Sequence, residues 1–336
     1  MNHAMTTATV TAGVPVFNMG PLMKRRIENL LEQSYANLKI LISDNDSTDE
    51  TQEVCLQYAK KYPQIVYVRQ KANIGQAKNF EFVLKNARTD MFFLASGDDW
   101  HSPSFVAESV AELNRHPECS LCSTAMRFVD DDQNPVDWPR KDRELWPTRQ
   151  ITDGDKIRRF MFGASGFYLY SLIHLSRIDP RLMEMARYTC APYYEYPWVL
   201  GLTMTGSFCH TDTTYLTYTL HNKRTLSLES EYAIAHSMPS SMDSNAMLFL
   251  DRYRAVVDEL APDQRTANRI KNQILIGALI STGGSLDWYK RAKPIKIWPQ
   301  LCSLLRKVDV WGLCFLICMQ IFRIKPLRLL FRQRIY

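Results

Sequence analysis

Short apolar runs alternate with helical patterns over the first 125 residues. Four runs have the length and the polar flanks of buried strands, at 9–17, 38–43, 64–69 and 91–96. Helical spacing of apolar residues marks three further segments, at 21–35, 75–88 and 103–114. Ser47 and Glu50 have the spacing of a capping box, which predicts another helix that ends near Tyr62. This alternation predicts an α/β fold with a mixed, mainly parallel sheet and flanking helices.

Polar residues follow each predicted strand: Asn18, residues 44–49, residues 71–73, and Asp98 with Asp99. Ligands of parallel sheets bind beyond the carboxyl ends of the strands, so we expect these residues to converge on one site. Neither a dinucleotide-binding GxGxxG nor a P-loop motif occurs, which disfavours a dehydrogenase or a P-loop enzyme. Carboxylates and amides instead suit a hard divalent cation that holds a diphosphate.

The sequence "FFLASGDDWH" (92–101) raises a question about charge. Asp98 and Asp99 follow an apolar run directly, and adjacent carboxylates at the end of a buried strand repel each other and resist desolvation. We therefore expect a divalent cation and its diphosphate to meet Asp98.

Composition is that of a folded globular chain, with 336 residues, 46% hydrophobic and 23% charged. The first residues lack the features of a signal peptide, and eight scattered cysteines indicate a reducing cytosol. Cys119 and Cys122 form a CxxC without a second pair or a histidine cluster. We interpret this CxxC as part of a buried strand, with a redox or metal role as the less favoured alternative.

Positive charge is concentrated at the end of the chain. Residues 287–336 contain eleven basic and two acidic residues, a net +9, so the total of +6 leaves −3 for the rest. The apolar run at 310–322 is too short to span a bilayer. We expect residues 287–336 to contact an anionic membrane surface; the alternative is a helix pair packed on the domain, with a solvated basic face. The protein is then peripheral on the cytoplasmic face of the inner membrane, without a nucleic-acid partner, and its oligomeric state stays open.

Four motifs together resemble the successive signatures of the family 2 glycosyltransferases. They are "VPVFN" (14–18), "ISDNDSTDET" (42–51), "ANIGQAKNFEF" (72–82) and "LASGDDW" (94–100), and their order and spacing match as well. The resemblance covers roughly residues 8–228 and implies the GT-A fold. It implies a catalytic domain at 1–228, with a nucleotide-sugar half at 8–125 and an acceptor half at 126–228. We expect a helical C-terminal region at 229–336.

The resemblance also implies roles for individual residues. Asp44 is similar to the aspartate that accepts a hydrogen bond from the uracil imide, and Asp98 is similar to the metal ligand of the family's DXD motif. The other residues expected around the nucleotide sugar are Pro15, Val16, Asn18, Asp46, Asn73, Gly75, Lys78, Ser96, Gly97 and Trp100. Trp100 either floors the sugar pocket or fills core beside the metal site. Ser96 stands where the family often has aspartate, so one carboxylate is lost and weaker metal binding is expected.

Two further site residues are predicted from the later part of the chain. "YYEYPWVLGLTMTG" (193–206) resembles the family's segment with the catalytic base, which makes Glu195 the candidate base and puts Tyr194 in place of an acid. The alternative is that Glu195 is only a helix-start carboxylate, favoured there by the helix dipole. "LTYTLHNKRTLS" (216–227) brings His221 into register with a histidine that reaches the metal or diphosphate, although a lone histidine is more often structural.

The predicted function is inverting transfer of a sugar from a nucleotide sugar, expected to be UDP-linked, with Mg²⁺ or Mn²⁺ as cofactor. The acceptor is a hydroxyl of a glycan or lipid-linked molecule, in bacterial surface polysaccharide biosynthesis. The alternative is a non-catalytic GT-A-like module that binds nucleotide or membrane, which Ser96 and Tyr194 favour. A nucleotidyltransferase is disfavoured because residues 16–26 lack a glycine-rich phosphate loop.

Overall fold

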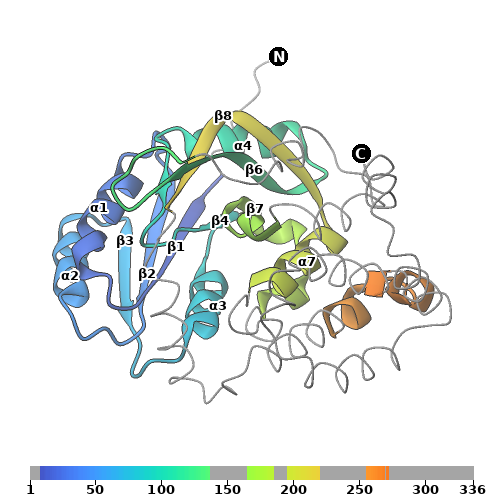
Figure 1. Ribbon diagram of the computed structural model, residues 1–336, viewed down its shortest axis with the longest axis horizontal. Coiled ribbons are helices and arrows are strands. Elements are labelled where there is room, and N and C mark those ends of the chain that lie inside the picture. The colour runs from blue at the N-terminus through green and yellow to red at the C-terminus, as the bar shows by residue number, and fades with distance from the viewer. Residues whose placement is uncertain (1–7, 137–164, 185–194, 220–254, 269, 272–336) are drawn as a thin grey trace, which may run out of the picture. The chain divides into compact units, whose positions relative to one another are not determined.

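The computed structural model describes residues 8–136, 165–184, 195–219, 255–268 and 270–271 (Figure 1). The chain divides into two compact units, residues 1–262 and 263–336, each of which is considered by itself. The predicted boundary at 228, His221 and the basic segment 287–336 lie outside the described residues. Within the described part, no helix has the length and apolar character needed to cross a membrane.

The first unit begins with strands and helices in alternation. The elements up to residue 129 are β1 (Val10–Val16), α1 (Gly20–Leu31), β2 (Leu38–Asp44), α2 (Thr51–Lys61), β3 (Ile65–Arg69), α3 (Gln76–Asn86), β4 (Met91–Leu94), β5 (Trp100–His101), α4 (Phe105–Arg115) and β6 (Cys119–Val129). The later elements are the 3-10 helix η2 (Ser165–Tyr170), β7 (Leu172–His174), the 3-10 helices η3 (Leu175–Arg177) and η4 (Pro180–Met183), α7 (Glu195–Thr205) and β8 (Ser207–Thr219).

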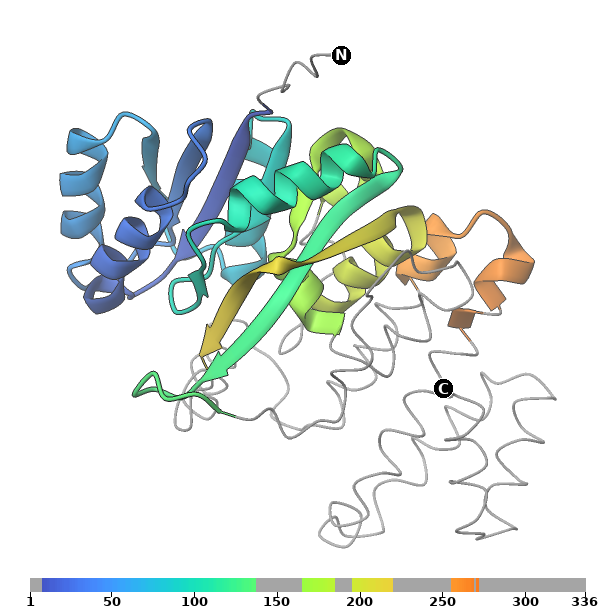
Figure 2. The ribbon, with the colours of Figure 1, turned by 90° about the horizontal axis from the view of Figure 1, so that it is seen from above.

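The strands form one eight-stranded sheet in the order β3-β2-β1-β4-β7-β6-β8-β5. β1 pairs in parallel with β2 and β4, and β2 pairs in parallel with β3. β7 runs antiparallel to β4 and β6, while the long strands β6 and β8 are parallel and lie side by side (Figure 2). The predicted class, a mixed and mainly parallel sheet with flanking helices, is confirmed.

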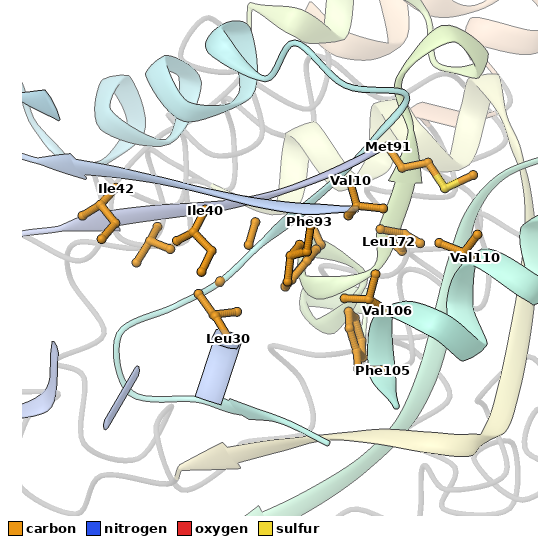
Figure 3. Close-up of a cluster of buried hydrophobic side chains, with 14 of the residues drawn as sticks. Val10, Leu30, Ile40, Ile42, Met91, Phe93, Phe105, Val106, Val110 and Leu172 are labelled. Atoms are coloured by element: carbon orange, nitrogen blue, oxygen red, sulfur yellow. The ribbon is translucent and has the colours of Figure 1, made fainter. Parts of the chain in front are cut away.

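The main core lies between one face of the sheet and three helices (Figure 3). Even-numbered residues of β1 and β2, such as Val10 and Ile40, point to this face because side chains alternate along a strand. The helices contribute Leu30 from α1, Cys55 from α2 and Phe105 from α4, all at most 1% exposed. On the opposite face, Gly13 of β1 packs against Phe92 and against Val83 of α3. Both faces near the carboxyl ends of β1 and β2 are thereby covered, which leaves the loops beyond those ends as the open polar edge.

Helix α1 ends at Leu31, four residues before the predicted end at 35. The chain leaves the helix there because the backbone N–H of Ser34 donates to the carbonyl of Pro103, at 2.8 Å. The apolar spacing that predicted a longer helix carries no information about this distant partner.

The predicted capping box at Ser47 and Glu50 is wrong. α2 begins at Thr51, whose backbone N–H donates to the Asp49 carboxylate at 3.0 Å. The side chain of Glu50 makes no capping hydrogen bond. The hydroxyl of Ser47 instead accepts from the backbone N–H of Asn18 at 2.9 Å. Ser47 therefore joins the loop after β2 to the turn after β1 and does not cap α2.

Candidate functional site

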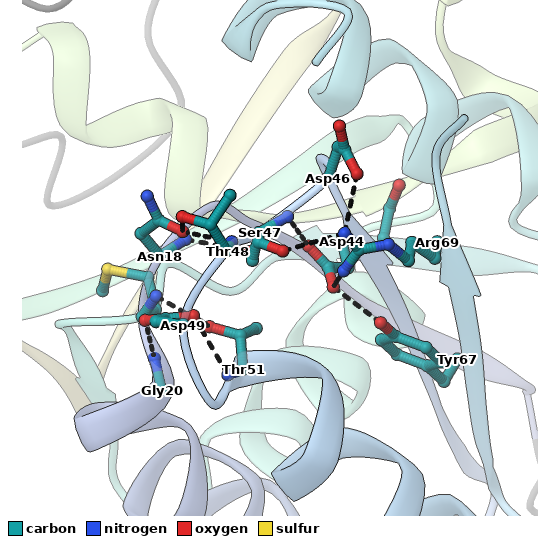
Figure 4. Close-up of polar contacts among 12 residues, drawn as sticks. Asn18, Gly20, Asp44, Asp46, Ser47, Thr48, Asp49, Thr51, Tyr67 and Arg69 are labelled. Carbon is teal, nitrogen blue, oxygen red and sulfur yellow. Dashed lines mark hydrogen bonds and ion pairs between the residues drawn. The ribbon is translucent and has the colours of Figure 1, made fainter. Parts of the chain in front are cut away.

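The turn after β1 is tied to the loop after β2 through Asn18 (Figure 4). Asn18 has φ 52, and its side-chain oxygen accepts from the backbone N–H of Thr48 at 2.8 Å. The next two backbone N–H groups, of Met19 and Gly20, donate to Thr51 and Asp49 at 3.0 Å each. Hydrogen bonds from Thr51 and Gly20 lower the pKa of Asp49 even though partial burial opposes this. These contacts fix the start of α1 against the second loop.

Asp44 is a buried carboxylate that the protein itself satisfies. One oxygen accepts from the backbone N–H of Ser47 at 2.8 Å, and the other from the Tyr67 hydroxyl at 2.6 Å and Arg69 at 3.2 Å. The Asp44 side chain is fully buried, and its burial is compensated by Arg69. Burial, followed by the bond to Asp44, raises the pKa of Tyr67. The structure therefore shows Asp44 as the centre of a polar network, and its predicted contact with uracil stays a prediction.

Asp46 is the carboxylate of this loop that faces solvent. Its backbone has φ 66, and its side chain is 41% exposed. Arg69 bridges Asp46, at 2.7 Å, to Asp44 and to the carbonyl of Ser47 (Figure 4). Tyr67 and Arg69 were not anticipated from the sequence, where β3 offered only its apolar alternation.

The loop after β3 joins the same edge. The side chain of Asn45 donates to Asn73 at 2.8 Å and accepts from the backbone N–H of Ile74 at 2.8 Å. Asn73 also accepts from the backbone N–H of Gly75 at 2.9 Å. Gly75 precedes α3 with φ 83, a conformation that favours glycine, and Lys78 is exposed on the first turn of that helix.

The structure thus brings together the predicted residues from three loops. Pro15 and Val16 lie at the end of β1, within hydrogen-bonding register of β2, and the backbone N–H of Asn45 donates to the carbonyl of Val16 at 2.8 Å. The roles predicted for these residues with a nucleotide are not tested by their placement.

The loop after β4 presents Asp98 beside Ser96. The Ser96 hydroxyl donates to the Asp98 carboxylate, and both residues are partly exposed. Gly97 lies between them, buried, against the side-chain methyl of Met19 at the start of α1. The Asp98 loop is therefore next to the turn that contains Asn18. Ser96, expected to weaken a metal site, is placed to orient the carboxylate that remains.

Asp99 points into the protein instead of toward the open edge. It is 2% exposed and accepts from the backbone N–H of Thr219 at 3.1 Å, while the Thr219 hydroxyl donates to the carbonyl of Asp98 at 2.8 Å. Burial, and then the neighbouring Asp98, raises the pKa of Asp99 to about 8, so this carboxyl is largely uncharged at neutral pH. The two adjacent acids are therefore compatible because their environments differ and because Asp99 is largely uncharged.

A buried arginine lies behind this acidic pair. Arg26 of α1 is completely buried and donates to the carbonyl of Asp99 at 2.6 Å and to Asn29 at 3.1 Å. Its other terminal nitrogen lies 3.0 Å from Nδ1 of His101, which accepts because a guanidinium has no acceptor atom. Burial lowers the pKa of Arg26 to about 10, partly offset by Asp99 and Asp98, so it remains cationic. The sequence held a signal for this residue, since Arg26 is spaced three from Met23 and four from Leu30 on the apolar face of α1.

Trp100 is almost entirely enclosed. It is 9% exposed, and the guanidinium of Arg25 lies 4.1 Å from the centre of its ring. Arg25 also donates to Gln133 at 3.1 Å, in the turn after β6. In this arrangement Trp100 offers little surface to a ligand.

The candidate base and the candidate metal site are only partly described. Glu195 is the first residue of α7, its side chain lies outside the described set, and so does the whole of His221. No group of three or more His, Cys, Asp or Glu residues is placed to hold a metal within the described ranges. The oxygens of Asp98 and Ser96 are hard donors, which fit a cation that takes most of its ligands from water and phosphates.

The sheet order and the polar edge beyond β1 to β4 define the class of the domain, a GT-A glycosyltransferase fold. Residues 11–174 match the family model described as Glycosyl transferase family 2, and this segment of the chain belongs to that family. The resemblance seen in the four motifs is thereby confirmed.

Similar proteins agree with this assignment. The chain is 34% identical over 111 residues to the uncharacterized protein Rv1520 of Mycobacterium tuberculosis, a match that covers 31% of this chain and 32% of that protein. It is 30% identical over 117 residues to the putative glycosyltransferase EpsE of Bacillus subtilis, covering 34% and 42% of the two chains. The match thus spans less than half the length of these curated relatives.

A solved structure is similar over more of the chain. TarS 1–349 of S. aureus in complex with UDP-GlcNAc has a TM-score of 0.64 and 15% identity, covering 88% of this chain and 79% of that one. This likeness shows the fold.

Proposed function

We propose that the protein is an inverting glycosyltransferase that moves a sugar from a UDP-sugar to a hydroxyl of a glycan or lipid-linked acceptor. The observation that carries the proposal is the joined polar edge of a family 2 domain, where the loops of Asn18, Asp46 and Asn73 meet beside the loop of Asp98. Ligands of parallel sheets bind at such an edge. UDP as the nucleotide is supported by the fold's likeness to TarS, which has been solved with UDP and with UDP-GlcNAc.

The cation belongs to this proposal as well. Asp98 would hold Mg²⁺ or Mn²⁺, and the hydroxyl of Ser96 fixes the orientation of that carboxylate. When bound, the cation would stabilise the charge that develops on the departing diphosphate. His221, predicted to reach the metal or diphosphate, completes the proposed set.

Glu195 is the proposed general base. It stands at the start of α7, and a carboxylate there takes the proton from the acceptor hydroxyl as that oxygen attacks the anomeric carbon. Attack from the face opposite the diphosphate inverts the configuration, so an α-linked donor gives a β-linked product.

The acceptor and the location follow from the basic end of the chain. Residues 287–336, with a net charge of +9 and an apolar run at 310–322, suit the surface of an anionic membrane. This would place the enzyme on the cytoplasmic face of the inner membrane, near lipid-linked acceptors of surface polysaccharide assembly. Separation of a cell lysate into membrane and soluble fractions tests this; recovery in the soluble fraction at low and high salt alike would count against it.

Release of UDP from a panel of UDP-sugars tests the activity. Wild-type protein is expected to release UDP from at least one donor, and Asp98→Ala and Glu195→Ala are each expected to lower that rate at least a hundredfold. The second candidate, a non-catalytic module, is favoured by Ser96 and Tyr194. Tight UDP binding without turnover of any donor would support the module instead.

A further inference from the structure

One face of α1, together with the residues just past its end, carries a row of polar side chains that bind the main chain after Asp98. The members of this row, which we call the α1 ladder, are Arg26, Asn29 and Gln33. The spacing of three residues places Arg26 and Asn29 on the same face of α1, and Gln33 follows two residues after the helix ends at Leu31. Asn29 accepts from the backbone N–H of His101 at 3.1 Å and donates to its carbonyl at 2.8 Å.

Gln33 continues the ladder toward α4. Its side chain donates to the carbonyl of Ser102 at 2.8 Å and accepts from the backbone N–H of Val106 at 3.2 Å. Ser102 lies three residues before α4 begins, and Val106 is the second residue of that helix. Gln33 is therefore an anchor for that helix, and it is uncharged.

Arg26 differs from the other two members because it is a completely buried cation that forms no ion pair with any of the described residues. Its Nε, like Nε2 of its partner His101, has no hydrogen-bond partner among the residues that the structure describes. Burial of such a charge is costly. The carbonyl of Asp99, which accepts from Arg26, and the electrostatic contribution of Asp98 oppose this cost. The position of Arg26 is thus energetically coupled to the acidic pair.

The main chain at the acidic pair is held from two sides. Arg26 binds the carbonyl of Asp99, while Thr219 binds the Asp99 side chain and the carbonyl of Asp98. With the backbone held in this way, the side chain of Asp98, in the bend at residues 97–98, stays partly exposed beside Ser96.

We propose that Arg26 is a positioning residue for the donor diphosphate, acting through the main chain of Asp99 to hold Asp98 at the open edge. The inference rests on the proposed function and names a residue of the same site. Arg26 itself touches neither the donor nor a cation, because it is completely buried.

The test is the affinity of the full chain for UDP with MnCl₂, measured by isothermal titration calorimetry. Arg26→Gln removes the guanidinium that binds both the carbonyl of Asp99 and the ring of His101. This variant is expected to weaken UDP binding about tenfold. Gln33→Ala, on the same ladder, is the matched control and is expected to stay within about twofold of wild type. Thermal unfolding of each variant reports its loss of stability.

A second variant separates positioning from stability. Arg26→Met combined with His101→Leu removes both buried polar partners together, and apolar replacement of buried polar groups is often tolerated. This double variant is expected to fold, and still to bind UDP about tenfold more weakly. A double variant that binds UDP within twofold of wild type would overturn the proposal.

Amide hydrogen exchange distinguishes this inference from the proposed function. Arg26→Gln is expected to speed exchange in residues 97–101, and Gln33→Ala in residues 102–106. If wild-type protein binds no UDP, the proposed donor is wrong, and unchanged exchange at 97–101 in Arg26→Gln would then overturn the role of Arg26 as well. Faster exchange confined to 97–101 would support its hold on the loop.

Discussion

At the scale of single residues, Asp98 and Asp99 show how neighbours of one type acquire different chemistry. Asp98 is partly exposed beside Ser96, whereas Asp99 is buried with a pKa raised to about 8 by burial and by Asp98. The sequence analysis singled out the acidic pair and predicted that a cation meets Asp98, which stays a prediction. It could not predict that Asp99 turns inward, because the groups that receive it, Thr219 and Arg26, come from distant parts of the chain.

Asparagine substitutions test whether Asp98 and Asp99 differ in their importance for activity. Asp98→Asn is expected to lower the rate of UDP release at least a hundredfold, since it removes the proposed cation ligand. Asp99→Asn is expected to stay within about threefold at pH 7, because it replaces a largely uncharged carboxyl by an amide of similar shape. Equal losses in the two variants, at equal melting temperatures, would show that both carboxylates act in the site.

At the scale of secondary-structure elements, α1 connects the first loop of the sheet edge to the segment after Asp98. Its start is fixed by Met19 and Gly20, and its inner face binds Asp99 and His101. Gln33, just past its end, binds Ser102. Apolar spacing predicted the helix and its buried side. The spacing did not predict that polar residues share this side, because hydrogen bonds to an irregular segment leave no periodic signal.

His101 makes the stability of this connection depend on pH. It packs against Arg26 of α1, Phe93 of β4 and Phe105 of α4, and burial, followed by the charge of Arg26, lowers its pKa well below 6.5. The unfolded chain binds a proton below pH 6.5 that the native state does not, so stability falls as the pH drops below that value.

The variant His101→Asn keeps an acceptor for Arg26 and removes the titrating ring. Its melting temperature is expected to fall less between pH 8 and pH 5 than that of the wild type, because other acid-sensitive groups are common to both proteins. The melting temperatures are measured by differential scanning fluorimetry. A fall of the same size in the wild type and in His101→Asn would show that His101 does not cause this pH dependence.

At the scale of the whole molecule, the fold was largely predictable and the site only partly. Alternation of apolar runs and helical patterns predicted the parallel half of the sheet, from β1 to β4, because the inner strands β1, β2 and β4 are buried on both faces and therefore apolar nearly throughout. The motifs predicted which loops meet at its edge. Arg69 and Tyr67, which enclose Asp44, were missed because an alternating edge strand gives no sign of what its polar side chains bind.

Release of UDP from a UDP-sugar by the purified full-length protein is the most direct test of the central claim. The polar edge beyond β1 to β4 is proposed to bind the donor and to activate it for transfer. The expected result is release from at least one UDP-sugar that depends on Asp98 and on Glu195. Release that survives Asp98→Ala and Glu195→Ala, or no release from any UDP-sugar by wild-type protein that binds UDP, would contradict the claim.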